Sequence, residues 1–149
     1  DIGCGIGRLT ELFAQDFKEV YGIDISEKMI EQGKERLSNL SNAHLYATDG
    51  LHFPFEDNFF DFVFSFVVFH HMPNKEVVEQ NLREVYRTLR LGGIAKIQIR
   101  GGKEPYRWQW YHGQAFKKEE AIQMLSKIGF KILQTQGENT KLFWLWLSK

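Results

Sequence analysis

The sequence predicts an α/β fold built on a doubly wound, mostly parallel sheet, and three observations support this prediction. A turn with glycine at every second position, Gly3, Gly5 and Gly7, opens the chain and leads directly into a helical pattern. Short apolar stretches then alternate with amphipathic stretches of helical period. Such repeated strand–helix–strand units imply a parallel sheet with helices on both faces. No linker or low-complexity segment divides the 149 residues, so we expect a single domain.

The glycine turn predicts the end of a strand followed by a helix over residues 8–17. Only Asp1 and Ile2 precede the turn, whereas a strand usually needs about five residues. We therefore expect the first strand to be truncated and the chain to be an N-terminally truncated fragment of a larger protein. The helical residues expected to face inward are Leu9, Leu12, Phe13 and Phe17.

A strand, a helix and a second strand are expected next. The first strand covers residues 19–24 and ends in a carboxylate, and Ser26 is expected to cap a helix that runs to about residue 39. The second strand covers residues 43–48 and leads into an Asp-Gly pair. The helical residues expected to face inward are Met29, Ile30, Gly33 and Leu37.

The middle of the chain predicts two more strands around a long helix. A nearly continuous apolar stretch over residues 61–68 is typical of a parallel strand that is covered on both faces. Asn74 is expected to cap a helix that reaches Arg90, and Gly92-Gly93 would end it before a strand over 94–100. The helical residues expected to face inward are Val78, Leu82, Val85 and Leu89.

The C-terminal third predicts a helix and a hairpin. Helical spacing over residues 117–128 stops at Gly129. Two strand-like stretches, 130–136 and 141–147, then flank a short polar connection. An antiparallel pair is therefore expected at one edge of the sheet.

Two carboxylates follow predicted strands, where ligands bind in doubly wound sheets. Asp24 could accept hydrogen bonds from both hydroxyls of a ribose. Alternatively, it is a charge that stabilises the N-terminus of the next helix. Asp49 could accept a hydrogen bond from an adenine amino group, or belong to an ordinary Asp-Gly turn.

His70 and His71 directly follow the strand predicted over 61–68. An imidazole titrates near neutral pH, so either residue could act as a general base. Adjacent side chains point apart, so we expect one of them, preferably His71, to face a substrate. A capping or packing role is the alternative. The remaining histidines lie in unrelated segments, so no metal site is expected.

Residues 101–112 follow a predicted strand and are rich in aromatic side chains. Loops at this edge carry specificity, and aromatic rings could stack on a flat substrate or surround a cation. We interpret the segment as a candidate substrate lid, with core or partner packing as the alternative. The candidate substrate contacts are Tyr106, Trp108, Trp110 and Tyr111. Trp144 and Trp146 lie two residues apart in a strand and are expected to pack on one face.

Composition narrows the class of protein. The chain has 19 basic and 19 acidic residues, so no net charge would attract a polyanion and no nucleic-acid partner is expected. Cys4 is the only cysteine, which favours a reducing, cytoplasmic compartment. No apolar stretch reaches the roughly 18 residues that a membrane span needs, and no secretory signal is visible.

Four stretches resemble, in order and spacing, the successive motifs of class I S-adenosylmethionine-dependent methyltransferases: DIGCGIGRLTELFA, YGIDISEKMIEQGKER, ATDGLHFPFEDNFFDFVFS and LREVYRTLRLGG. The subgroup they resemble most is methyltransferase type 11, the ubiquinone/menaquinone-biosynthesis type. The resemblance covers about residues 1–98. It implies a Rossmann-like sheet of strand order 3-2-1-4-5-7-6, in which strand 7 is antiparallel and strand 1 is the truncated one.

The resemblance also implies S-adenosylmethionine as the cofactor and a set of residues around it. These are Asp1, Gly3, Gly5 and Gly7 at the methionine part, Asp24 at the ribose, Asp49, Gly50 and Leu51 at the adenine, and Ser65 and Phe66 at the amino-acid moiety.

The implied function is methyl transfer to a small-molecule acceptor by in-line displacement. Enzymes of this superfamily that methylate base amino groups carry two prolines after the fourth strand, and residues 65–68 contain none. One alternative is a non-catalytic module that binds the cofactor or regulates a partner. Another is a nicotinamide-dependent oxidoreductase, which the glycine spacing disfavours because its third glycine would come three residues after the second. The sequence predicts no particular oligomeric state.

Overall fold

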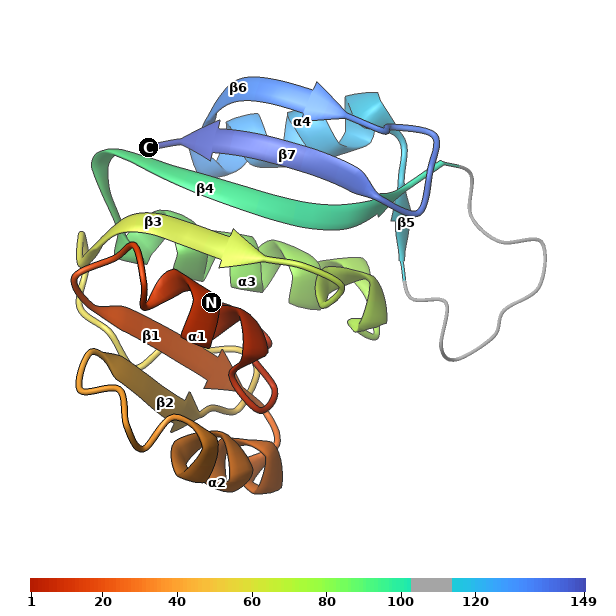
Figure 1. Cartoon of the computed structure of the whole chain (residues 1–149). Helices are drawn as coiled ribbons and strands as arrows, with labels where there is room; N and C mark the ends of the chain where they lie inside the picture. Colours follow the sequence, from red (N-terminus) through yellow and green to blue (C-terminus); the bar gives the residue numbers. More distant parts are fainter. Residues whose placement is uncertain (103–113) are drawn as a thin grey trace. The chain divides into compact units, whose positions relative to one another are not determined.

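The computed structural model describes residues 1–102 and 114–149, which form two compact units, 1–54 and 55–149 (Figure 1). Tyr106, Trp108, Trp110 and Tyr111, the predicted substrate contacts, lie outside the described residues. No helix among the described residues is both long and apolar enough to cross a membrane.

The first unit alternates helices and strands, as predicted. Its elements are α1 (Arg8–Phe13), β1 (Val20–Asp24), α2 (Glu27–Arg36) and β2 (Ala43–Ala47). The two strands pair in parallel, from Val20 opposite Ala43 to Asp24 opposite Ala47. Ile2 forms a single parallel bridge with Ile23. The predicted pairing of the short first strand with the strand over 19–24 is therefore confirmed.

Close approach of α2 to the strands forms the core of this unit. Cys4, Ile30, Leu37 and Leu45 make one buried apolar cluster. A methyl group on Gly33 would lie 2.5 Å from the Cδ1 atom of Leu45, so only glycine lets the helix come this near. Ser26 caps α2 as predicted, because its Oγ accepts the Met29 N–H at 3.3 Å.

The predicted inner faces of this unit are partly wrong. The first helix ends at Phe13 instead of residue 17, and Leu12 and Phe17 are 56% and 40% exposed. Thr10 takes the buried position, because its hydroxyl donates to the Asp1 carboxylate at 2.8 Å. A pattern of apolar residues alone could not predict a buried threonine. Met29 is also exposed, whereas the other predicted residues of α2 are buried.

The second unit contains a sheet of order β3-β4-β7-β6, with the short β5 paired to β4. Its elements are β3 (Phe60–Ser65), a 3-10 turn η1 (Phe69–His71), α3 (Lys75–Thr88), β4 (Leu89–Gly101), β5 (Ala115–Phe116), α4 (Lys118–Ile128), β6 (Lys131–Gln136) and β7 (Phe143–Ser148). β3 and β4 are parallel, and β7 is antiparallel to both β4 and β6. The predicted strand order 4-5-7-6 and the antiparallel last strand are confirmed.

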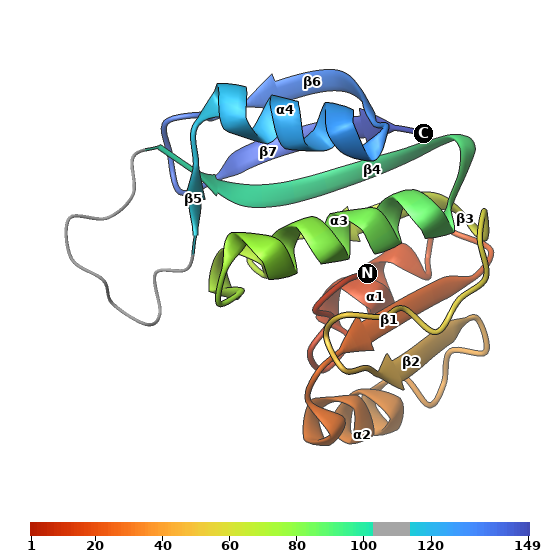
Figure 2. The same ribbon diagram turned by 180° about the vertical axis from the view of Figure 1, so that it is seen from behind.

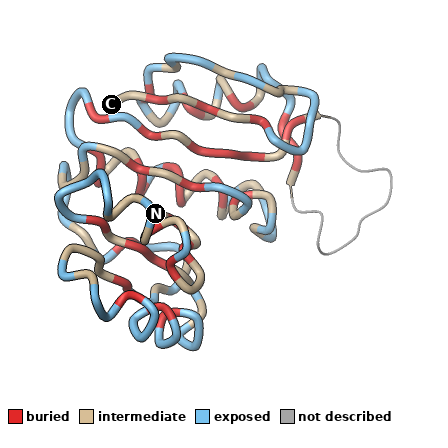
Figure 3. Tube along the Cα trace, viewed as in Figure 1, coloured by how far each residue is buried: buried red, intermediate tan, exposed pale blue. Residues whose placement is uncertain are grey.

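One face of this sheet carries the helices α3 and α4. Figure 2 shows α3 and α4 against the sheet, and Figure 3 shows the buried residues along β4 and β7. The residues buried on this side include Val78, Leu82, Val85, Ala121, Leu125, Ile97, Leu145 and Leu147. Trp144 and Trp146 share the opposite face, as predicted, where the Lys96 ammonium lies 4.9 and 5.0 Å from their ring centroids.

Two predicted boundaries in this unit are wrong. The long helix, capped by Asn74 as predicted, ends at Thr88, and β4 already begins at Leu89. The reason is a backbone bond from Gly92 N–H to the Lys149 carbonyl, which draws the two glycines into the strand instead of ending the helix. The apolar strand ends at Ser65 instead of residue 68, because Val67 adopts a φ of 61°.

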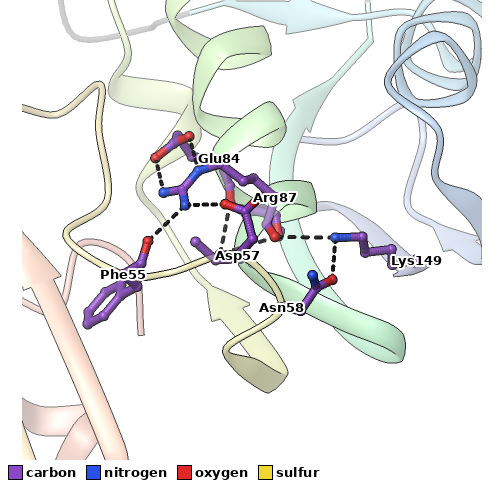
Figure 4. A network of polar contacts seen from close by, with 8 residues as sticks. Phe55, Asp57, Asn58, Glu84, Arg87 and Lys149 are labelled. Carbon is purple, nitrogen blue, oxygen red and sulfur yellow. Dashed lines mark hydrogen bonds and ion pairs between the residues drawn. The ribbon is translucent and has the colours of Figure 1, made fainter.

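A polar network closes one end of this unit (Figure 4). The Arg87 guanidinium donates to both carboxylate oxygens of Glu84 at 2.7 Å and to Asp57 at 2.8 Å. The Lys149 ammonium donates to Asn58 at 2.8 Å and to the Arg87 carbonyl at 3.2 Å. The network therefore joins the loop before β3, the end of α3 and the last residue of the chain.

Candidate functional site

The glycine turn has the conformation that its sequence predicts. Gly3, Gly5 and Gly7 have φ angles of 71°, 54° and 78°, a left-handed region that L side chains rarely occupy. The N–H groups of Gly3 and Cys4 donate to the Ile23 carbonyl at 2.8 and 3.0 Å. The turn is thus fixed to β1 next to its carboxyl end.

The glycines of this turn serve different purposes. A methyl group on Gly7 would lie 2.7 Å from the Cδ1 atom of Leu37, so Gly7 is needed for packing against α2. A methyl group on Gly5 would meet no described atom within 4 Å. Gly5 therefore borders open space, which is where a ligand can approach the backbone.

Asp24 ends β1 and points toward this turn. Its Oδ2 atom accepts the Gly5 N–H at 2.9 Å, and its Oδ1 atom accepts the Ser26 N–H at 2.9 Å. A carboxylate has about four lone-pair sites, so these two bonds leave acceptor capacity for hydroxyl groups. The carboxylate braces the turn and the start of α2, and it remains able to bind a ribose.

Asp1 and Cys4 have structural contacts in the same unit. The Asp1 carboxylate accepts the Thr10 hydroxyl and so connects the turn to α1. Burial, together with the nearby Asp24 charge, raises the pKa of the Cys4 thiol to about 12. Cys4 packs in the buried apolar cluster of this unit, where the neutral thiol is favoured.

Asp49, Gly50 and Leu51 follow β2 at the same edge. The Asp49 Oδ1 atom accepts the N–H groups of Leu51 and His52 at 2.8 Å each, and Oδ2 lies 2.7 Å from His52 Nδ1. The hydrogen bond with His52, followed by the two backbone bonds, lowers the pKa of this carboxyl to about 2. The loop is thus held by an ionised carboxylate.

Ile25 is a further candidate site residue, which the sequence alone did not suggest. It directly follows Asp24, is 73% exposed, and its Cγ2 atom would lie 2.9 Å from a methyl group on Gly50. Together with the exposed Leu51, it provides an apolar surface suited to a flat base. The sequence signal that could have indicated it is its position directly after Asp24, the carboxylate that ends β1.

The second unit holds the other predicted site residues at the carboxyl end of β3. Ser65 is fully buried, whereas Phe66 is partly exposed and its ring stacks on Trp144 at 5.4 Å and 8°. Phe66 is therefore the member of the pair whose side chain can contact a ligand. The ring centroids of His70 and His71 are 4.1 Å apart, so the expectation that their side chains point apart is wrong. Both residues lie in the 3-10 turn that follows β3, not in an extended strand.

The two histidines differ in their surroundings. His71 is exposed, whereas His70 is half-buried and its Nδ1 atom has no hydrogen-bond partner among the described residues. Burial, then the neighbouring His71, lowers the pKa of His70, and the charges of Arg100 and Lys141 act in the same direction. These surroundings outweigh a hydrogen bond with the Gln98 side chain, which acts in the opposite direction, and they favour the neutral imidazole.

The structure brings the predicted residues together within each unit. The glycine turn, Asp1, Asp24 and the Asp49–Leu51 loop lie in the first unit, and Ser65, Phe66, His70 and His71 lie in the second. Within the described ranges, no group of three or more His, Cys, Asp or Glu side chains is arranged to hold a metal ion.

Comparison with known proteins identifies methyltransferases as relatives over most of the chain. Residues 1–97 match the family described as methyltransferase domain. Phosphoethanolamine N-methyltransferase 2 from Caenorhabditis elegans is 34% identical over 147 residues, 92% of this chain and 33% of its own length. Demethylmenaquinone methyltransferase from Staphylococcus haemolyticus is 41% identical over 97 residues, 63% of this chain and 39% of its own length.

Solved structures support the fold. An S-adenosylmethionine-dependent methyltransferase from Clostridium acetobutylicum superposes with a TM-score of 0.81 at 15% identity, over 99% of this chain and 82% of its own. A protein from Pyrococcus horikoshii superposes with a TM-score of 0.80 at 21% identity, over 99% of this chain and 79% of its own. The chain spans between about a third and two fifths of the curated relatives' length. It belongs to the class I methyltransferase domain family, whose cofactor is S-adenosylmethionine.

Proposed function

We propose that the whole protein transfers a methyl group from S-adenosylmethionine to a small-molecule acceptor. The observation that carries the proposal is the hydrogen bond from Gly5 N–H to Asp24, beside the open space at Gly5. A carboxylate with spare acceptor sites next to an unobstructed glycine backbone suits a nucleoside whose ribose offers two hydroxyl groups. The residues present therefore fit this cofactor.

Each part of the cofactor has candidate residues in the chain. The turn of Gly3, Gly5 and Gly7, with Asp1, would hold the methionine part, and Asp24 the ribose. Asp49, Gly50 and Leu51, together with Ile25, would hold the adenine. Ser65 and Phe66 would line the amino-acid moiety.

The chain's own residues would mainly position the reactants. The bound cofactor supplies a methyl group that is already electrophilic, and orientation alone can lower such a barrier by roughly 7–11 kcal/mol. Where the acceptor must lose a proton, His70 or His71 would take it at a ring nitrogen. The Nδ1 atom of His70 has no hydrogen-bond partner in the described part of the chain, whereas His71 has the greater exposure.

Two observations support a methyl acceptor that is an amine and also carries an anionic group. The nematode relative, named for phosphoethanolamine, matches 92% of this chain, including the C-terminal third. Arg100 and Lys141 are also close enough to His70 for their charges to lower its pKa. These cations, at the end of β4 and before β7, are suited to a phosphate group.

The segment of residues 101–112 is proposed to contact this acceptor. Its aromatic residues Tyr106, Trp108, Trp110 and Tyr111 could surround a cationic amine. The cytoplasmic location and the single-domain organisation likewise stay predictions.

Calorimetric titration of the whole protein with S-adenosylhomocysteine tests the cofactor assignment. Asp24→Ala should weaken binding about tenfold to a hundredfold, because a charge-assisted bond of about 1.5–3 kcal/mol is lost. Glu19→Ala is the matched control, since Glu19 is a carboxylate just before the same strand and pairs with His44. Unchanged affinity in a folded Asp24→Ala protein would remove the ribose assignment.

The alternative is a module that binds the cofactor without catalysis. Tight binding of S-adenosylhomocysteine, combined with no methyl transfer to amines or quinols, would favour that alternative.

A further inference from the structure

We propose that Gln98 is a positioning residue that fixes the backbone after β3 and so places Phe66 and the His70–His71 turn. This inference rests on the proposed function, because it concerns the same site. It begins with Val67, which has a φ of 61° although it is β-branched. A branched residue in this left-handed region is strained and persists only where its surroundings hold it there.

The holding contact comes from the middle of the sheet. Gln98 lies in β4 and is fully buried, and its Oε1 atom accepts the Val67 N–H at 3.0 Å. Its Nε2 atom donates to the Lys141 carbonyl at 2.7 Å and also to the Ile99 carbonyl. One amide thus connects β4 to the loop after β3 and to the loop before β7.

The two neighbours of Val67 show what this contact determines. On one side, the Phe66 ring stacks on Trp144, the residue that pairs with Gln98 across β4 and β7. On the other side, the His71 N–H donates to the Val68 carbonyl at 2.9 Å, so the histidine turn begins one residue after Val67. A change at Val67 would therefore move both candidate site groups.

A buried glutamine in a strand is costly unless its amide is satisfied. Here the acceptor and donor groups are both used, and the acceptor serves a strained residue instead of the regular ladder. An apolar side chain would be sufficient if this position only packed the core. The use of both ends of the amide points to a role in the geometry of the loop.

The test compares Gln98→Leu with the double variant Gln98→Leu/Val67→Gly in the whole protein. In Gln98→Leu, the Val67 amide should exchange its hydrogen at least about tenfold faster than in the wild type. Loss of the contact should lower kcat/KM for S-adenosylmethionine, with phosphoethanolamine as the acceptor, by about tenfold to a hundredfold. Glycine occupies positive φ freely, so Val67→Gly should restore most of this loss.

Thr88→Val is the control for simple destabilisation. It removes a buried hydroxyl that donates to the Glu84 carbonyl at 2.8 Å, at the far end of α3 from the histidine turn. It should lower the melting temperature and leave kcat/KM unchanged.

Two results would overturn the proposal. One is Gln98→Leu with wild-type kcat/KM and wild-type affinity for S-adenosylhomocysteine. The other is a double variant that regains melting temperature but not turnover, which would show that Gln98 does not act on turnover through the Val67 backbone. The wild type could bind S-adenosylhomocysteine and yet transfer no methyl group to phosphoethanolamine. In that case the affinity for S-adenosylhomocysteine replaces kcat/KM as the quantity that is compared between the variants. A wild type that does not bind S-adenosylhomocysteine would instead refute the proposed function.

Discussion

Single atoms at the ends of strands determine what the candidate site can do. The Asp24 carboxylate braces two backbone N–H groups, those of Gly5 and Ser26, and still has lone pairs for a ligand. The His70 imidazole has a buried Nδ1 atom with no partner among the described residues. Asp24 can therefore accept a further hydrogen bond from a ligand, and His70 can accept a proton at Nδ1.

The pKa of His70 predicts how stability responds to acid. Burial lowers this pKa from its ordinary value of 6.5, so the unfolded chain binds a proton more readily than the folded one. Stability should therefore fall as the pH drops below about 6.5. Melting temperatures of the wild type and His70→Asn between pH 8 and 5 check this, and the variant should lose less stability across the range.

His71→Asn is the matched control for this titration. Its side chain is exposed, so its replacement should leave most of the acid sensitivity in place. Equal acid sensitivity in the wild type and His70→Asn would show that other groups cause it.

At the scale of elements, the glycine turn separates packing from ligand binding. Gly7→Ala places a methyl group 2.7 Å from Leu37 Cδ1 at a positive φ, so it should cost about 1–2 kcal/mol for the backbone and about 1–3 kcal/mol for overpacking. Gly5→Ala places its methyl group in open space, so it should cost only the backbone strain but obstruct the cofactor.

Urea unfolding and titration with S-adenosylhomocysteine measure the two effects. The prediction is that Gly7→Ala is the less stable variant and that Gly5→Ala loses more affinity relative to its stability. The reverse order would contradict the assignment of Gly5 to the ligand.

The polar network at the end of α3 should stabilise the second unit. Glu84 is buried and binds Arg87 through both carboxylate oxygens. Glu84→Ala should therefore lower the free energy of unfolding by about 1–3 kcal/mol, since hydrogen bonds to a charged group are lost. Glu79→Ala, on the same helix, breaks an exposed pair with Arg83 and should cost only about 0.3–0.5 kcal/mol. Equal losses in urea unfolding would show that the network adds little.

The sequence predicted the kinds of elements better than their ends. Ser26 and Asn74 identified two helix starts because their side chains cap the backbone locally. The end of α3 depends on the pairing of Gly92 with Lys149, which is remote in sequence and has no local signal. The end of β3 depends likewise on Gln98, a residue on another strand.

At the scale of the whole molecule, the order of motifs predicted the order of strands in both units. That Asp24 and Gly5 lie close together was predictable, because both belong to the motifs that the sequence resembles. Ile25, Thr10 and Gln98 were not, because their roles depend on burial and on partners from other elements.

The aromatic segment can be tested at this scale. Alanine at Tyr106, Trp108, Trp110 and Tyr111 should reduce turnover and spare affinity for S-adenosylhomocysteine, because the predicted cofactor residues lie earlier in the chain. Melting temperature, affinity and turnover should be measured on each variant. Normal turnover in all of them would refute the lid, and parallel loss of stability and of both activities would show packing.

Methyl transfer by the whole protein tests the central claim most directly. The measurement follows labelled methyl groups from S-adenosylmethionine to phosphoethanolamine, with ethanolamine as the control that lacks the phosphate. We predict transfer to phosphoethanolamine with a kcat/KM at least about tenfold above that for ethanolamine, because an anionic group can pair with Arg100 and Lys141. Transfer to neither acceptor, nor to a quinol, by a folded protein that binds S-adenosylhomocysteine would contradict the account.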